Sequence, residues 1–136
     1  MTSPLDRLND LKPEPPDANE FAGLKRSAAA RLRDASVKDL SLESRFTLAY
    51  DAAHAYCLAA LRYRGFRASN RYIVFQVLPH TLGLGPEVWR VLAKCHQQRN
   101  LAEYQGELDV DERLLLDLLS ACDAVRVKVE ALGPLP

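Results

Sequence analysis

Hydrophobic residues recur every three or four positions along most of the chain, which is the spacing of one face of an α-helix. Five segments carry this spacing, and they predict helices over residues 18–35, 42–64, 70–78, 86–104 and 110–131. No segment shows the strict alternation of a half-buried strand, so we expect no β-structure.

Residues at the ends of these segments support the predicted helices. Asp17 with Glu20, and Asp109 with Glu112, have the spacing of a capping box, in which side chains satisfy the first amides of a helix. Gly65 follows the longest segment, where a glycine commonly terminates a helix. The predicted fold class is therefore all-α, an antiparallel up-and-down bundle of four main helices plus one short helix.

The ends of the chain differ in composition from its middle. Residues 1–16 are polar and rich in proline, which predicts a flexible N-terminal arm. Residues 17–132 form the helical-bundle domain in this interpretation, and residues 133–136 a short C-terminal tail.

Charge and hydropathy narrow the classes of function. The chain of 136 residues has 18 basic and 18 acidic side chains, so nucleic-acid binding would have to be local rather than spread over a basic surface. No apolar run is long enough to span a membrane, and the N-terminus lacks the charged-then-apolar order of a signal peptide. We therefore expect a cytoplasmic protein with no membrane contact.

Cysteine and histidine are few and scattered. Cys57, Cys95 and Cys122 lie on apolar helical faces, as expected of buried thiols in a reducing compartment. Neither residue type shows the spacing of zinc ligands, so we predict no metal site and no cofactor. His54, inside the longest predicted helix, is interpreted as a hydrogen-bonded core residue.

A polar turn interrupts the apolar face of the segment 86–104. In steps of three and four, this face carries Val88, Leu92, Cys95, Arg99 and Ala102. Arg99 thus occupies a position where the pattern predicts a hydrophobic side chain. Burying a cation among hydrophobic side chains costs free energy unless the cation forms an ion pair or faces a binding site.

Two interpretations of this turn stay open. In the first, Arg99 and Asn100 bind an anion such as a phosphate, Tyr104 supplies a hydroxyl group and His96 is an acid–base group. In the second, Arg99 forms a half-exposed ion pair with Glu103, and His96 is a solvated surface residue.

A second basic feature surrounds the end of the longest helix. Four arginines alternate there with aromatic residues; they are Arg62, Arg64, Arg67 and Arg71. Such a pattern can bind an RNA backbone and stack bases. Cations at a helix C-terminus also complement its dipole, which is the alternative explanation for the first two arginines.

The run from Gln98 to Tyr104, followed by Asp109-Val110-Asp111 at the start of the next helix, resembles the HEPN superfamily. The signature of this family is an arginine, usually followed by a polar residue such as asparagine, and a histidine after a short spacer. Arg99-Asn100 matches its first half, and Tyr104 stands where the family has the histidine. The resemblance covers about residues 18–131.

The resemblance implies a small helical bundle that forms a homodimer and acts on RNA. In active members of this family the arginine and histidine support metal-independent cleavage, in which the ribose 2′-hydroxyl attacks the neighbouring phosphate. Related members are encoded beside small nucleotidyltransferases as toxin–antitoxin-like pairs. The two functions implied are thus an endoribonuclease with a site at the dimer interface, or a non-catalytic accessory subunit of a nucleotidyltransferase-type partner.

Overall fold

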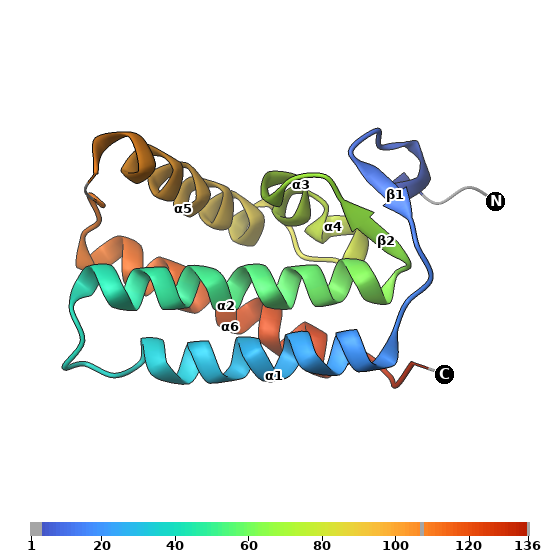
Figure 1. Cartoon of the computed structure of the whole chain (residues 1–136), viewed down its shortest axis with the longest axis horizontal. Coiled ribbons are helices and arrows are strands. Elements are labelled where there is room, and N and C mark those ends of the chain that lie inside the picture. The colour runs from blue at the N-terminus through green and yellow to red at the C-terminus, as the bar shows by residue number, and fades with distance from the viewer. Residues whose placement is uncertain (1–3, 107, 136) are drawn as a thin grey trace.

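Each long amphipathic segment of the sequence forms a helix in the computed structural model, which describes residues 4–106 and 108–135 (Figure 1). In chain order the elements are the 3-10 turn η1 (Pro4–Arg7), β1 (Leu11–Pro13), α1 (Ala18–Ala35), α2 (Leu42–Tyr63), β2 (Phe66–Ala68), α3 (Arg71–Gln76), α4 (Leu78–Thr81), α5 (Pro86–Gln105) and α6 (Glu112–Glu130). The prediction of a mostly helical fold is confirmed. The predicted segment 70–78 is divided between α3 and α4, because Pro79 cannot donate a backbone hydrogen bond.

Side-chain caps mark the start of α1, α2 and α6, whereas α5 begins at Pro86 without one. The Asp17 carboxylate accepts a hydrogen bond from the Glu20 amide at 2.9 Å, as the sequence predicts. The cap of α6 is Asp111, which accepts from the Leu114 amide at 2.8 Å, so the predicted cap at Asp109 is wrong. Gly106 ends α5 with φ of 74°, a left-handed conformation that favours glycine.

The expectation of no β-structure is wrong for two short segments. β1 and β2 pair antiparallel, with Leu11 opposite Ala68 and Pro13 opposite Phe66. Strands of three residues are too short to show an alternating pattern, which is why the sequence does not reveal them. Of the segment 1–16 predicted as a flexible arm, residues 4–16 are held against the bundle by this pairing and by the buried side chains of Leu5 and Leu11. Residues 1–3 of that segment lie outside the described residues.

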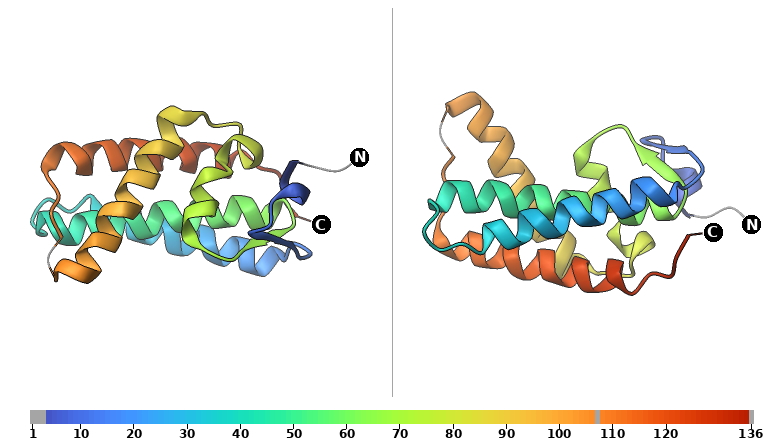
Figure 2. Two further views of the ribbon diagram at one scale, coloured as in Figure 1. Left: turned by 90° about the horizontal axis from the view of Figure 1, so that it is seen from above. Right: turned by 60° about the horizontal axis from the view of Figure 1, so that its bottom comes forward.

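Consecutive long helices run in opposite directions, and α2 lies in the middle of them (Figure 1). It packs against α1 on one side and α6 on another, while α5 crosses it obliquely (Figure 2). The face of α2 that its neighbours approach is lined by alanines with no or little exposed surface: Ala49, Ala52, Ala53, Ala55, Ala59 and Ala60. Because these side chains are small, several helices can approach the same helix closely.

The three cysteines are buried and unbonded, as expected from the sequence. Burial raises the pKa of Cys95 and of Cys122 to about 12, so both remain thiols. Within residues 4–106 and 108–135, no helix is long and apolar enough to cross a membrane.

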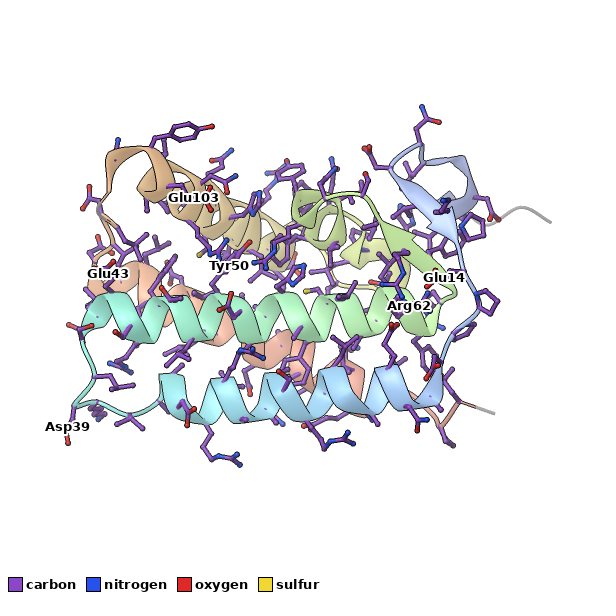
Figure 3. The ribbon with its side chains drawn as sticks, viewed as in Figure 1. Glu14, Asp39, Glu43, Tyr50, Arg62 and Glu103 are labelled. Carbon is purple, nitrogen blue, oxygen red and sulfur yellow. The ribbon has the colours of Figure 1, made fainter. Side chains whose placement is uncertain are left out.

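Arg62, near the end of α2, holds residues 14–20 against the bundle. Its side chain is 2% exposed, and every nitrogen of its guanidinium contacts an oxygen (Figure 3). Nε donates to the Glu20 carboxylate at 2.5 Å, while the two terminal nitrogens donate to the backbone carbonyls of Glu14, Pro15 and Phe66. The Glu14 carboxylate lies 3.2 Å from the same group. The cost of burying this cation is therefore offset by a complete set of acceptors.

Arg67 of β2 completes this ion-pair cluster. It donates to Glu14 at 2.6 Å and to Glu20 at 2.9 Å. Burial alone would raise the pKa of Glu20, but hydrogen bonds from Arg67 and Arg62 outweigh it and leave the pKa below its usual value. The stability contributed by Glu20 is therefore present above its unfolded pKa of about 4.3 and is lost as the pH falls through the lower folded value.

Substitution of Arg62 by methionine should destabilise the protein by about 2–3 kcal/mol, because three backbone carbonyls and two carboxylates lose their donor. Urea unfolding followed by circular dichroism measures the change. Arg113→Met is the matched control, since Arg113 is 83% exposed and pairs with Asp117 on its own helix. Equal unfolding midpoints for the two variants would contradict the role assigned to Arg62.

Candidate functional site

A cluster of polar side chains from three helices surrounds the buried ring of Tyr50. Tyr50 rises from α2 toward α5 and has no exposed surface (Figure 3). His96 and Arg99 reach it from α5, and Arg71 reaches it from the start of α3. Asn100, also on α5, contacts His96. The spacing of three and four residues places the α5 side chains on one face of that helix.

Both ring nitrogens of His96 are hydrogen-bonded within the chain. Nδ1 lies 2.8 Å from the Tyr50 hydroxyl oxygen, and Nε2 lies 3.1 Å from the amide nitrogen of Asn100. Because an amide nitrogen only donates, Nε2 accepts in this arrangement and the neutral ring carries its proton on Nδ1. The Asn100 side chain is exposed, so it is the part of this network that solvent or a ligand can reach.

Burial and the neighbouring arginines keep both histidines of this region neutral. Burial lowers the pKa of His96, and the positive charges of Arg71 and Arg99 lower it further. Burial and the same arginines lower the pKa of His54 to about 4. Since both pKa values are depressed only in the folded state, folding stability falls as the pH drops from about 6.5 toward 4.

Two guanidinium groups face the ring of Tyr50. The Arg99 guanidinium carbon lies 5.1 Å from the ring centroid, and that of Arg71 lies 5.9 Å from it, both within the range of a cation–π contact. Burial raises the pKa of Tyr50, although the two arginines oppose this effect, so the hydroxyl stays protonated.

The carboxylates near these arginines lie at the limit of an ion pair. Arg99 is 4.0 Å from Glu103, and Arg71 is 3.8 Å from Asp51. A direct charge-assisted hydrogen bond is about 2.7–2.9 Å long. Arg99 thus forms the ion pair with Glu103 that the second interpretation predicts, although loosely. The same interpretation is wrong in making His96 a solvated residue, because both of its ring nitrogens are hydrogen-bonded. The guanidinium groups keep donors that an anion can use.

The structure separates Tyr104 from this cluster. Its side chain is 89% exposed at the end of α5. It borders a surface groove of about 300 Å³ together with Gln97, Asn100 and Leu101. Asn100 is therefore the residue shared by this groove and the His96 hydrogen-bond network.

The four arginines predicted to bind RNA also separate into two groups. The guanidinium of Arg62 is buried and fully used, so it has no donor to offer a phosphate. Arg64 donates to the Thr81 carbonyl at 3.1 Å, and Arg67 pairs with Glu14 and Glu20. Of the four, Arg71 lies beside the Tyr50 cluster.

Sequence reasoning missed two members of this region, both on α2. Tyr50 and His54 are four residues apart, so they share a helix face, and each contacts the ring of Phe75 at 5.9 Å. Two polar rings one turn apart, in a helix otherwise lined by alanine, were the available signal. The prediction that His54 is hydrogen-bonded is wrong, because it has no hydrogen-bond partner among the residues that the structure describes.

The described part of the chain holds no group of three or more histidine, cysteine or acidic residues that could bind a metal ion. No protein-family model, no curated protein and no solved structure matches the chain. The geometry of the cluster and the sequence are therefore the basis of the functional proposal.

Replacing Arg99 with alanine should raise the pKa of His96 and of His54, because the substitution removes a positive charge that disfavours their protonation. Titration of the histidine ring signals by NMR measures both values. In the wild type, His54 should be half protonated near pH 4.

Arg90→Ala is the matched control, since Arg90 lies on the same helix but over the Trp89 ring. It should leave both titrations unchanged. Titration curves that are identical in Arg99→Ala and the wild type would show that Arg99 does not act on these rings.

Proposed function

We propose that this protein acts on RNA as a HEPN-type helical protein of a toxin–antitoxin-like system. The observation that carries the proposal is the pair of Arg71 and Arg99, two guanidinium groups from different helices that face one buried tyrosine ring. Their loose contacts to carboxylates leave donors for the phosphodiester backbone. The alternating directions of the long helices support an antiparallel up-and-down, HEPN-like bundle as the fold.

The proposed reaction is metal-independent cleavage of RNA. The ribose 2′-oxygen attacks the neighbouring phosphorus, a new bond from phosphorus to the 2′-oxygen forms, and the bond to the 5′-oxygen breaks. Arg99 and Arg71 stabilise the negative charge that develops on the phosphate oxygens. The products are a 2′,3′-cyclic phosphate and a 5′-hydroxyl group, whose oxygen is protonated by water.

His96 is the proposed general base in place of Tyr104. Its lowered pKa keeps the ring neutral near pH 7, so the ring can accept the 2′-hydroxyl proton. Nε2 becomes accessible when the exposed Asn100 side chain turns aside, while the hydrogen bond between Nδ1 and Tyr50 holds the ring in place. Tyr104 is less suited to this role, because a tyrosine hydroxyl has a reference pKa of about 10.

Purified wild-type protein should cleave single-stranded RNA in the presence of EDTA. Arg99→Ala should reduce the rate on the order of 100-fold or more, because it removes a charge that stabilises the transition state. His96→Ala should have a comparable effect, and Tyr104→Phe should have little effect if His96 is the base. Gel analysis of an end-labelled oligonucleotide measures these rates.

Arg90→Ala controls for the loss of one positive charge from α5. Cleavage that persists unchanged in Arg99→Ala would refute the assignment of the site. Wild-type protein that binds RNA without cleaving it would favour the alternative described below.

The second candidate is a non-catalytic accessory subunit that binds a nucleotidyltransferase-type partner. The observation that favours it is the engagement of both His96 ring nitrogens within the chain, as expected of a structural histidine. In this case the exposed face of α5 binds the partner protein, and Arg99 and Arg71 contribute to that surface without chemistry.

A homodimer is part of the proposal. Three exposed hydrophobic side chains lie on α3 and on the last two turns of α5: Tyr72, Leu101 and Tyr104. A second copy that covered this surface would place its own α5 beside the Arg71 and Arg99 pair, as the resemblance implies. Exposed apolar patches of this kind are typical of protein–protein contacts.

Leu101→Glu should convert the dimer to a monomer in sedimentation-velocity experiments, because it places a charge in the centre of the proposed interface. The control is Leu116→Glu on α6, since Leu116 has similar exposure, 52% against 48% for Leu101. A dimer that is lost equally in both variants, or a wild-type protein that is a monomer, would contradict this interface.

A further inference from the structure

A small cavity lies beside the Tyr50 cluster, between α2, β2 and α3. Its volume is about 260 Å³, and its walls are His54, Leu58, Arg67, Ala68, Ser69, Asn70, Arg71 and Val74. Arg71 belongs both to this wall and to the pair of arginines facing Tyr50. The cavity and the proposed phosphate site therefore have Arg71 in common.

The walls of the cavity combine apolar and hydrogen-bonding surfaces. Leu58, Ala68 and Val74 supply aliphatic contacts, and His54 supplies a flat aromatic ring with one donor and one acceptor. His54 is neutral at pH 7, and among the described residues its ring nitrogens have no hydrogen-bond partner. A partly buried histidine with both ring nitrogens unused is the group in this wall that a ligand can satisfy.

The other polar groups of the wall are already engaged. The Asn70 carbonyl oxygen accepts from the Ile73 amide at 3.0 Å and so caps α3, and the Ser69 hydroxyl is 3.4 Å from the Asp10 carboxylate. Arg67 is held by Glu14 and Glu20. Specific recognition in this cavity therefore depends on His54 and on the loosely paired Arg71.

We infer that this cavity binds the base of the nucleotide whose phosphate lies between Arg71 and Arg99. The inference rests on the proposed function and adds the site that recognises the base of the nucleotide. Single-stranded RNA is recognised by hydrogen bonds to the edges of its bases and by stacking on flat side chains and guanidinium groups. The size of the cavity suits one ring system, since pockets for larger ligands have volumes of about 300–1,000 Å³.

The test compares ligands with and without a base. Binding of the four ribonucleoside 5′-monophosphates and of ribose 5-phosphate to the full chain is measured by NMR titration. At least one nucleotide should bind on the order of tenfold more tightly than ribose 5-phosphate, because stacking and the edge of the base add to the phosphate contact. The nucleotide that binds most tightly identifies the base.

Two substitutions remove the contribution of the cavity to nucleotide binding in different ways. His54→Phe keeps a ring against Phe75 but removes both hydrogen-bonding nitrogens, and Ala68→Leu fills the cavity from β2. Each should lower the affinity for the nucleotide to that for ribose 5-phosphate and leave the latter unchanged. His80→Phe, on the exposed face of α4, is the control and should behave as the wild type.

The outcomes separate this inference from the proposed function. Equal affinity for nucleotides and ribose 5-phosphate in the wild type, or nucleotide binding that survives both substitutions, overturns the base site. Arg99→Ala should lower the affinity for nucleotides and for ribose 5-phosphate alike. If it does so while wild-type protein binds both with equal affinity, the phosphate site is supported and the base site is not. Failure of all these ligands to bind at millimolar concentration overturns both.

Discussion

Close packing around α2 is the constraint on which the other elements depend. A helix that contacts α1, α3, α5 and α6 cannot carry large side chains on all sides, and its alanines let these neighbours approach. Two of the large polar rings that it does carry, Tyr50 and His54, lie against Phe75 of α3. The polar cluster forms where this side of α2 faces α3 and α5, and its geometry is determined by the packing of the bundle.

Arginine has two different physical roles in this protein. Arg62 is buried and surrounded by acceptors at hydrogen-bonding distance, so its charge is used to hold residues 14–20 in place. Arg71 and Arg99 lie over a tyrosine ring with carboxylates only at 3.8 and 4.0 Å. The first arrangement gives stability and no reactivity, whereas the second leaves positive charge available to an anion. Residue type alone does not distinguish these roles, because the difference lies in the number and distance of the acceptors.

The sequence predicts the helices well because their signals are local. The hydrophobic period and the cap at Asp17 involve residues a few positions apart. The site depends on contacts between distant residues: Tyr50 and His96 are 46 positions apart, and Arg62 and Glu14 are 48 apart. Arg99 was recognised because it breaks a local pattern, and His96 because it lies one turn before Arg99. The burial of Arg62 could not be predicted in the same way, since it depends on which of several arginines the folded chain encloses. The start of α6 was misplaced because Asp109 and Asp111 are both suitable caps and only two residues apart.

The pairing of β1 with β2 also decides where the chain can be extended. It holds residues 4–16 at the end of the bundle where α6 finishes, away from the C-terminal end of α5 (Figure 1). A fused domain, an affinity tag or a surface tether at either terminus would thus leave the α5 face unobstructed.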